Sequence, residues 1–268
     1  MTMVRYQVIL AYDGTQFHGF QRQVNARTVQ GVVEAALRQL NWQGGSVLAA
    51  GRTDSGVHAF GQVIAFDLDW PHTPVNLLHA INFYLPADVA VLSVQTTSPD
   101  FHPRYDAISR RYRYNIYCHP VRDPLRERYA WRVWPAVELS VLQRAAGYLT
   151  GRHDFAAFGT SPRLGGHTIR TVLRAVWQEE GSNLVFDICA DAFLYHMVRR
   201  LVGLQVAIGQ GNLDIEVIPQ HLDNRPGVFK NNALSVKSLA PPQGLVLMEV
   251  RYLPETGGMR MNLVDDRQ

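Results

Sequence analysis

The sequence predicts an α+β fold in which helices accompany a largely antiparallel sheet. Three observations favour this class. The expected strands and helices are mixed without the strict strand–helix–strand alternation of a doubly wound parallel sheet. Some expected strands follow one another closely, as they do in hairpins. The chain before residue 103 and the chain after it contain strands and helices of similar length, which hints at two related halves, although no residue-level repeat is visible.

The first half is expected to begin with a strand over residues 5–12, which ends at the turn signal Asp13-Gly14. Thr28 then provides an N-cap for a helix that runs to about Leu40. Apolar residues recur there at helical spacing and form one face: Val29, Val32, Val33, Ala36, Leu37 and Leu40. The further elements expected in this half are strands near 46–50, 62–69 and 90–96 and a helix over 74–85 that starts at Pro74.

A turn-rich connection over residues 98–103 contains two prolines and marks the predicted boundary between two lobes. We therefore expect an N-terminal lobe at 1–103, a C-terminal lobe at 104–253 and a loose, polar tail at 254–268. The elements expected in the second lobe are strands near 110–118, 168–179, 184–190 and 244–252 and helices over 139–149, 192–208 and 214–222.

The composition is that of an ordinary globular protein, with 47% hydrophobic and 18% charged residues over 268 positions. No uninterrupted apolar stretch approaches the roughly 18 residues that a membrane span needs. The N-terminus also lacks the apolar core of a secretory signal. Cys118 and Cys189 are far apart in the sequence, so neither a disulfide framework nor a zinc site is expected. These features predict a cytoplasmic protein without a membrane partner.

The basic residues are almost all arginine. Of the 26 Lys and Arg residues only Lys230 and Lys237 are lysine, which leaves 24 arginines. Arginine binds phosphate through paired hydrogen bonds and stacks on bases, as RNA binding requires. A GC-rich genome or a bias toward heat tolerance would explain the same composition. Residues 104–132 hold eight arginines against three acids, interleaved with aromatic residues, and this run is interpreted as a phosphate-binding groove with stacking groups.

The most informative segment is GRTDSGVHA at residues 51–59, which follows a short apolar run typical of a strand end. It places Asp54 between two glycines and directly after Arg52 and Thr53. A carboxylate on such a loop is most often a turn or capping residue. Its chemical alternatives are a nucleophile, a general base and a metal ligand. The neighbouring guanidinium of Arg52 favours an ionised carboxylate, which indicates a nucleophile or a base.

The histidines do not form a metal-binding pattern. His18, His58, His102 and His196 are not spaced as HxxxH or HExxH, and no paired cysteines accompany them. The glycine-rich phosphate-binding patterns GxxxxGK[ST] and GxGxxG are also missing from the sequence. The sequence therefore predicts neither a metal nor a nucleotide cofactor.

Two further side chains are candidates for a functional site. Tyr112 alternates with Arg111 and Arg113 along an expected strand, and this periodicity suits a core position as well as a cleft. Arg199 lies one helical turn after Tyr195 in an apolar helix, where an arginine without a partner is rare. A solvated surface position is the alternative for this arginine.

Five segments, in order along the chain, resemble the motifs of tRNA pseudouridine synthases of the TruA family. Residues 51–59 resemble the GRTDxGVHA-type signature of that family. The other four segments are YDGTQFHGFQRQ at 12–23, FHPRY at 101–105, RRYRY at 110–114 and FLYHMVRRLVG at 193–203. Phe20 stands where the family commonly has tryptophan, a change that keeps an aromatic ring. The resemblance covers roughly residues 4–252.

The resemblance implies two α/β lobes that share a sheet, with the active-site cleft between them. It implies that Asp54 is the catalytic nucleophile and that Tyr112 stacks on the target uracil and is able to take part in proton transfer. It further implies that Arg199 pairs with Asp54 and that Arg52 helps the target base to leave the stack. The substrate would be tRNA, at positions 38, 39 and 40 of the anticodon stem-loop, and the enzyme a homodimer without a cofactor.

Three alternatives stay open at this point. A noncatalytic tRNA-binding protein or chaperone with the same fold would have no use for a nucleophile. A carboxylate hydrolase, for example of glycosides, usually needs two carboxylates, and no acidic partner stands out near Asp54 in the sequence. A pseudouridine synthase with other target positions is the third alternative, and the loop over 158–168, rich in Gly, Ser and Pro, is where such a change is expected.

Overall fold

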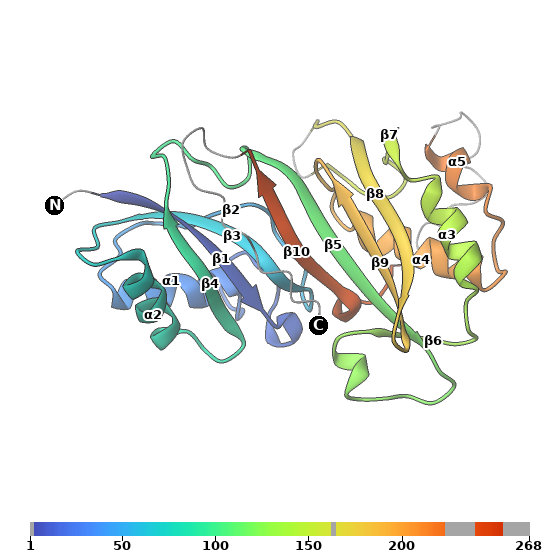
Figure 1. The fold of residues 1–268 in the computed structure, drawn as a ribbon, viewed down its shortest axis with the longest axis horizontal. Helices are drawn as coiled ribbons and strands as arrows, with labels where there is room; N and C mark the ends of the chain where they lie inside the picture. The colour runs from blue at the N-terminus through green and yellow to red at the C-terminus, as the bar shows by residue number, and fades with distance from the viewer. Residues whose placement is uncertain (1–2, 162–164, 223–238, 254–268) are drawn as a thin grey trace.

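A ten-stranded sheet runs through the molecule in the order β4-β1-β3-β10-β5-β9-β8-β7, with β2 paired to β3 and β6 paired to β5 (Figure 1). The computed structural model describes residues 3–161, 165–222 and 239–253. The strands are β1 (Val4–Tyr12), β2 (Leu48–Ala49), β3 (His58–Leu68), β4 (Val89–Thr96), β5 (Ala107–Cys118), β6 (Trp131–Val133), β7 (Gly151–Asp154), β8 (Ile169–Glu180), β9 (Asn183–Ala190) and β10 (Leu245–Tyr252). All pairs are antiparallel except β10 with β3 and β5 with β6. The predicted α+β class with a mostly antiparallel sheet is therefore confirmed.

Five α-helices accompany the sheet in the described ranges: α1 (Val29–Gln39), α2 (Pro74–Tyr84), α3 (Leu139–Gly147), α4 (Met197–Gly209) and α5 (Val217–Leu222). Three short 3-10 turns are η1 (Gly14–Gln16), η2 (Arg126–Arg128) and η4 (Pro242–Gly244). The predicted cap of α1 is confirmed, because the Thr28 hydroxyl accepts a hydrogen bond from the Gly31 N–H at 3.3 Å. None of these helices is long and apolar enough to cross a membrane.

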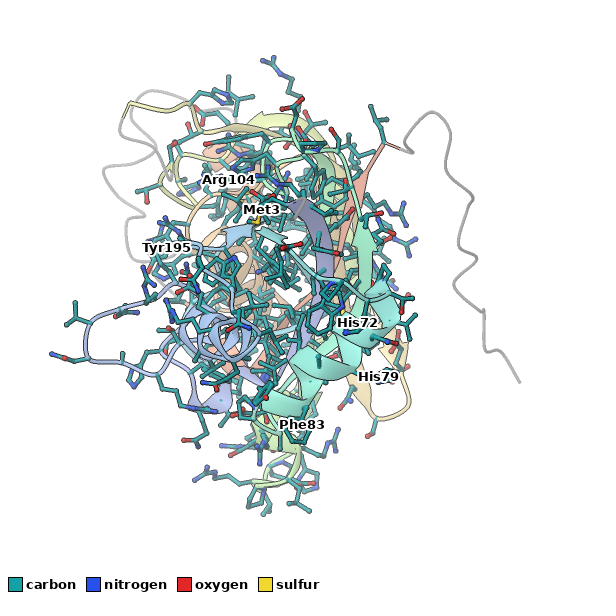
Figure 2. All side chains as sticks on the ribbon, turned by 90° about the vertical axis from the view of Figure 1, so that its left-hand side faces the viewer. Met3, His72, His79, Phe83, Arg104 and Tyr195 are labelled. Carbon is teal, nitrogen blue, oxygen red and sulfur yellow. The ribbon has the colours of Figure 1, made fainter. Side chains whose placement is uncertain are left out.

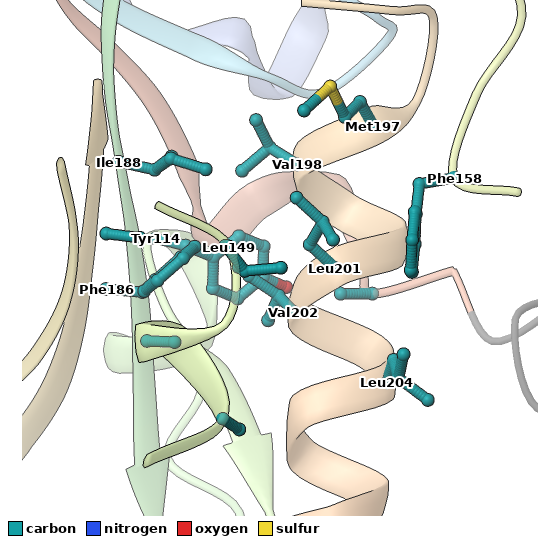
Figure 3. Packing of buried hydrophobic residues seen from close by; sticks show 14 of the residues in the cluster. Tyr114, Leu149, Phe158, Phe186, Ile188, Met197, Val198, Leu201, Val202 and Leu204 are labelled. Atoms are coloured by element: carbon teal, nitrogen blue, oxygen red, sulfur yellow. The ribbon is translucent and has the colours of Figure 1, made fainter. Parts of the chain in front are cut away.

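The sheet carries two hydrophobic clusters that meet at its centre. The first gathers apolar residues of β1, β3, α1 and α2, and the second gathers those of β5, β8, β9, α3 and α4. Figure 3 shows part of the second cluster, in which Leu201 and Val202 of α4 face Tyr114 and Phe186 of the sheet. Tyr112 packs against both clusters. The seam between them is therefore built into the sheet itself.

Strand β10 forms this seam. It pairs in parallel with β3 at Val246–His58 and Leu247–Ala59, and it pairs antiparallel with β5 on its other side. β3 and β5 are thereby joined through β10, and two lobes share one sheet. The lobe boundaries at residues 103 and 253 stay a prediction, and the predicted loose tail at 254–268 lies outside the described residues.

The structure corrects the predicted start of α4. The helix begins at Met197 and not at residue 192, because His196 has a left-handed backbone, with φ +64°, that no helix can continue through. The side chain of Asp191 holds the preceding turn by accepting a hydrogen bond from the Ala192 N–H at 2.6 Å. The short strands β6 and β7 were not predicted, since three or four residues carry little periodicity.

A buried polar pair in the second cluster gives a test of the packing. The Trp177 indole N–H donates to the Gln205 side-chain oxygen at 2.9 Å, and both side chains are fully buried. Gln205→Leu should leave this N–H without an acceptor and lower the free energy of unfolding by about 1–3 kcal/mol. Urea denaturation measures the difference.

The exposed Gln95 provides the matched control for this change. Gln95→Leu should alter the free energy of unfolding by less than about 0.5 kcal/mol, because water replaces its hydrogen bonds. Equal stability of the Gln205→Leu protein and the wild type would show that the indole N–H gains nothing from the glutamine.

Candidate active site

The loop at residues 51–57 lies against the N-terminal segment at residues 12–20. The Phe20 N–H donates to the Thr53 carbonyl at 3.1 Å, and the Gly56 N–H donates to the Phe17 carbonyl at 3.3 Å. Two of the segments that carry the family resemblance therefore form one backbone framework. This framework holds the Asp54 side chain in a fixed position between the two contacts.

Two glycines of the N-terminal segment allow this close approach. A methyl group on Gly14 would lie 2.1 Å from the Val57 carbonyl oxygen, and one on Gly19 would lie 2.9 Å from the Thr53 oxygen. Gly19 also has a φ of +86°, which L side chains rarely adopt. Larger residues at either position would push the loop away from the N-terminal segment at residues 12–20.

Buried polar side chains complete the support of the loop. The Tyr12 hydroxyl and the Thr53 hydroxyl lie 2.8 Å apart within hydrogen-bonding distance. The Gln62 amide donates to the Gly51 carbonyl at 3.0 Å. Burial raises the pKa of Tyr12 to about 12, so this hydroxyl stays protonated at neutral pH.

The structure brings Asp54 and Arg199 together. The Arg199 Nη1 lies 2.9 Å from Oδ2 of Asp54, and Nε of the same guanidinium donates to the Ala240 carbonyl at 2.7 Å. Arg199 is buried and belongs to the first turn of α4, where the positive end of the helix dipole lies. A carboxylate from one half of the chain therefore faces a permanent cation and a helix N-terminus from the other half.

Tyr112 lies beside this pair on β5. Its ring meets the ring of Phe193 edge-on, with centroids 5.0 Å apart. Burial raises the pKa of Tyr112 well above its usual value, and the nearby Tyr12 and Asp54 act in the same direction. The Tyr112 hydroxyl therefore keeps its proton over the physiological pH range.

The four predicted site residues line one open cavity with about 410 Å³ of empty space. Its walls comprise Arg52, Thr53, Asp54, Val57, Tyr112, Phe193, Leu194, Tyr195, His196, Met197, Val198, Arg199 and Leu245. Arg52 is exposed at this cavity and makes no hydrogen bond or ion pair within the described ranges. The cavity thus combines a charged pair, a free guanidinium and an apolar wall.

His196 is the cavity residue that the sequence did not single out. Its Nε2 lies 3.5 Å from Oδ2 of Asp54, and its ring stacks on Tyr195 with centroids 3.7 Å apart. In the sequence His196 was considered only as a metal ligand. The signal for this residue in the sequence is its position just before an apolar helix that contains arginines. The predicted helix start at residue 192 placed His196 inside the helix and hid this signal.

Comparison with known proteins identifies the family. The sequence profile described as "tRNA pseudouridine synthase" matches residues 8–106 and 145–253. The tRNA pseudouridine synthase A of Syntrophotalea carbinolica is 39% identical over 255 residues, which cover 95% of this chain and 98% of that protein. The enzyme of the same name from Moorella thermoacetica is 42% identical over 249 residues, with 92% and 98% covered.

The chain belongs to the tRNA pseudouridine synthase family. It is therefore an isomerase that acts on uridine in tRNA. A solved structure titled "Crystal Structure of a Cbf5-Nop10-Gar1 Complex" aligns at 12% identity and a TM-score of 0.34. That alignment covers 75% of this chain and 44% of the other, so the chain spans less than half of that structure's length.

In this tRNA pseudouridine synthase most of the arginine run is paired within the chain. Arg113, for example, contacts Glu180 at 2.9 Å and Asp187 at 3.0 Å. Seven of the eight arginines at 104–132 donate to groups of the chain: Arg110, Arg111, Arg113, Arg122, Arg126, Arg128 and Arg132. The run is therefore held in place by acids and carbonyl groups from other parts of the chain, and its interpretation as a phosphate-binding groove stays a prediction.

Asp13 is the partner that connects this run to the loop of Asp54 at residues 51–57. Its carboxylate accepts hydrogen bonds from Arg128 at 2.6 Å and from the Tyr129 hydroxyl at 3.0 Å. Burial works to raise the pKa of Asp13, but hydrogen bonds from Thr15, Arg128 and Tyr129 outweigh it and hold the pKa far below its usual value. The same carboxylate lies 3.2 Å from His58, two residues beyond Gly56 of the loop.

Burial of His58 predicts a pH dependence of stability. The Gly14 N–H donates to Nδ1 of the ring at 2.9 Å, which only the neutral imidazole accepts. Burial lowers the pKa of His58 in spite of the nearby Asp13 carboxylate. The unfolded chain then binds more protons below about pH 6.5, so stability is full above that pH and falls as the pH falls, by at most about 1.4 kcal/mol per pH unit for one proton.

His58→Gln should flatten this slope between about pH 6.5 and pH 5. Urea denaturation of wild type and variant across that range measures it. His72→Gln, at an exposed position, serves as the control and should keep the wild-type slope. A His58→Gln protein with the wild-type slope would assign the acid sensitivity to other groups.

Proposed function

We propose that this tRNA pseudouridine synthase converts uridine to pseudouridine at positions 38, 39 and 40 of the anticodon stem-loop, with Asp54 as the nucleophile. The observation that carries the proposal is the contact between Asp54 and Arg199 in a cavity that also contains Tyr112 and Arg52. The target positions are those that the family resemblance of the five motifs implies. The relatives named tRNA pseudouridine synthase A support tRNA as the substrate.

The reaction begins with removal of the target base from its stack, which costs a few kcal/mol in a paired stem. Arg52 is suited to assist this step, because its guanidinium is exposed at the cavity and has no partner in the described part of the chain. A planar guanidinium stacks on bases as well as donating hydrogen bonds. In this role Arg52 occupies the place that the uracil leaves.

Asp54 then supplies a carboxylate for cleavage of the bond between N1 of uracil and C1′ of ribose. Attack on C1′, attack on C6 and assistance to a glycal intermediate are the three routes that such a carboxylate serves. Tyr112 holds the detached base against its ring and donates through its neutral hydroxyl. Arg199 balances the charge of Asp54 throughout. The net reaction is an isomerisation, so it requires neither an oxidant nor an energy source.

We further propose a homodimer that acts in the cytoplasm. An exposed apolar surface on α2 supports the dimer, since Val75 is 62% and Phe83 is 81% exposed. Figure 2 shows Phe83 and His79 projecting from this helix. A tRNA is longer than one such protein, which also favours a binding surface made from two copies. Light scattering coupled to size exclusion, with Phe83→Asp as the variant, tests the assembly.

The nucleophile is tested by release of tritium from tRNA that carries 5-³H-uridine. Asp54→Asn should reduce release at least about 10⁴-fold, because a nucleophile cannot be replaced by an amide. Binding of tRNA should change little, since phosphate contacts supply most of the affinity. Asp100→Asn, at an exposed position, is the matched control and should retain wild-type release.

The outcomes of this assay separate the alternatives. Release by the Asp54→Asn protein at the wild-type rate would remove Asp54 from the chemistry while keeping the enzyme class. Absence of release by the wild type, with tRNA binding intact, would indicate a noncatalytic tRNA-binding protein. Mapping of the pseudouridines formed in tRNA checks positions 38, 39 and 40 independently.

The neutral state of Tyr112 leads to a second prediction. Tyr112→Phe removes only a hydrogen bond and should lower kcat by less than about tenfold. Tyr112→Leu removes the ring on which the base stacks and should cost about 10- to 100-fold. Single-turnover rates measure both variants. A much larger loss for Tyr112→Phe would show that the hydroxyl itself transfers a proton.

A further inference from the structure

The isomerisation leaves one proton without an assigned acceptor. When C5 of uracil joins C1′ of ribose, C5 carries both its hydrogen and the new bond. The C5–H bond must then break, and its electron pair forms the C5=C6 double bond. The pair of the N1=C6 bond moves to N1, which takes up one proton. A base in the cavity must therefore accept the proton of C5, and this inference rests on the proposed function.

Most polar groups of the cavity cannot serve as this base. Arg52 and Arg199 are permanent cations with no lone pair to offer. The Tyr112 hydroxyl holds its proton, because burial raises its pKa. The Asp54 carboxylate is free of the substrate at this step, but it is held in the ion pair with Arg199 at 2.9 Å, which lowers its basicity. Among the described residues that line the cavity, His196 is the only imidazole, the side chain that accepts a proton near neutral pH.

The geometry of His196 suits this task. Its Nε2 lies 3.5 Å from Oδ2 of Asp54, which is longer than a good hydrogen bond, so the ring is a neighbour of the carboxylate and is not bonded to it. The backbone at His196 has φ +64° and ψ 3°. A non-glycine residue in this left-handed region is strained and recurs at functional sites. In this conformation the His196 ring lines the cavity. It makes no side-chain hydrogen bond that caps α4.

The charges around His196 keep its imidazole neutral. Burial lowers its pKa most, Asp54 opposes this effect, and Arg199 and Arg200 of α4 add to it. The other titratable groups that line the cavity are Arg52 on the catalytic loop, Tyr112 on β5 and Tyr195 in the preceding turn. A neutral imidazole is a base that is ready to accept a proton at pH 7.

We propose that His196 is the catalytic base that accepts the C5 proton of the rearranged uracil and releases it to solvent. The ring stacks on Tyr195, which is 55% exposed, so the imidazole lies between the cavity and the surface of the molecule. The protonated imidazolium returns to neutrality by giving its proton to water. Hydrogen from C5 thereby reaches the solvent, where a tritium label is counted.

The test uses His196→Asn, because asparagine tolerates the left-handed backbone and offers no basic nitrogen. The single-turnover rate should fall about 100-fold or more, the usual contribution of a general base. The isotope effect with 5-²H-uridine tRNA should rise above the wild-type value, since C5–H cleavage becomes the slow step. His72→Asn, at an exposed position outside the helices and strands, is the matched control.

Two further measurements exclude a merely structural role. The wild-type rate should fall as the pH falls through the pKa of His196, below the usual histidine value, and this limb should vanish in His196→Asn. His196→Gly keeps the left-handed backbone without strain, and added imidazole should restore part of its rate.

The outcomes separate this inference from the proposed function. Wild-type tritium release accompanied by equal release, an equal isotope effect and an equal pH profile in His196→Asn would overturn the role of His196 alone. A rate loss with an unchanged isotope effect and no rescue by imidazole would also overturn it. Failure of the wild type to release tritium would instead overturn the proposed function.

Discussion

The ion pair between Asp54 and Arg199 is the contact that makes one site from two distant parts of the chain. It joins the catalytic loop to α4 across 145 positions of sequence. The carbonyl of Ala240 holds the same guanidinium from behind at 2.7 Å. A largely buried charge that loses its partner is strongly destabilising, so this arrangement resists separation of loop and helix. The cavity, and the orientation of Tyr112 toward it, depend on this placement of the loop against the helix.

Burial gives the groups around this ion pair different protonation states. It keeps the Tyr112 hydroxyl protonated, an effect to which the Asp54 carboxylate adds, and it keeps the imidazole of His196 unprotonated in spite of that carboxylate. Two neutral groups with opposite proton affinities thus face one charged pair. Environments that separate the proton affinities of neighbouring groups are how one site performs acid and base steps at the same pH. The glycine-supported loop and the strained turn before α4 hold these groups within one cavity.

Local signals in the sequence predicted most of the elements, because capping and periodicity are properties of neighbouring residues. Thr28 caps α1 as expected, and the loop of Asp54 directly precedes β3. The sequence does not predict features that are determined by a contact between distant residues. The apolar pattern of α4 extends back to residue 192, yet the backbone of His196, beside Asp54, starts the helix later. Nor does the sequence reveal the internal partners of the arginine run, because groups such as Asp187 lie in other strands. The contact between Arg199 and Asp54 was predicted from the family resemblance and not from the spacing of the residues.

The place of β10 in the sheet has a consequence for how the protein is made. β10, at Leu245–Tyr252, follows the other strands of the described residues in sequence but pairs with both β3 and β5 at the centre of the sheet. Without it the sheet divides into two separate halves. During synthesis the first half can fold as it leaves the ribosome, whereas the join between the halves waits for residue 245 and beyond. The cavity is therefore completed only after β10 has been synthesised, and until then each half has an unpaired strand edge of the kind that another chain can bind.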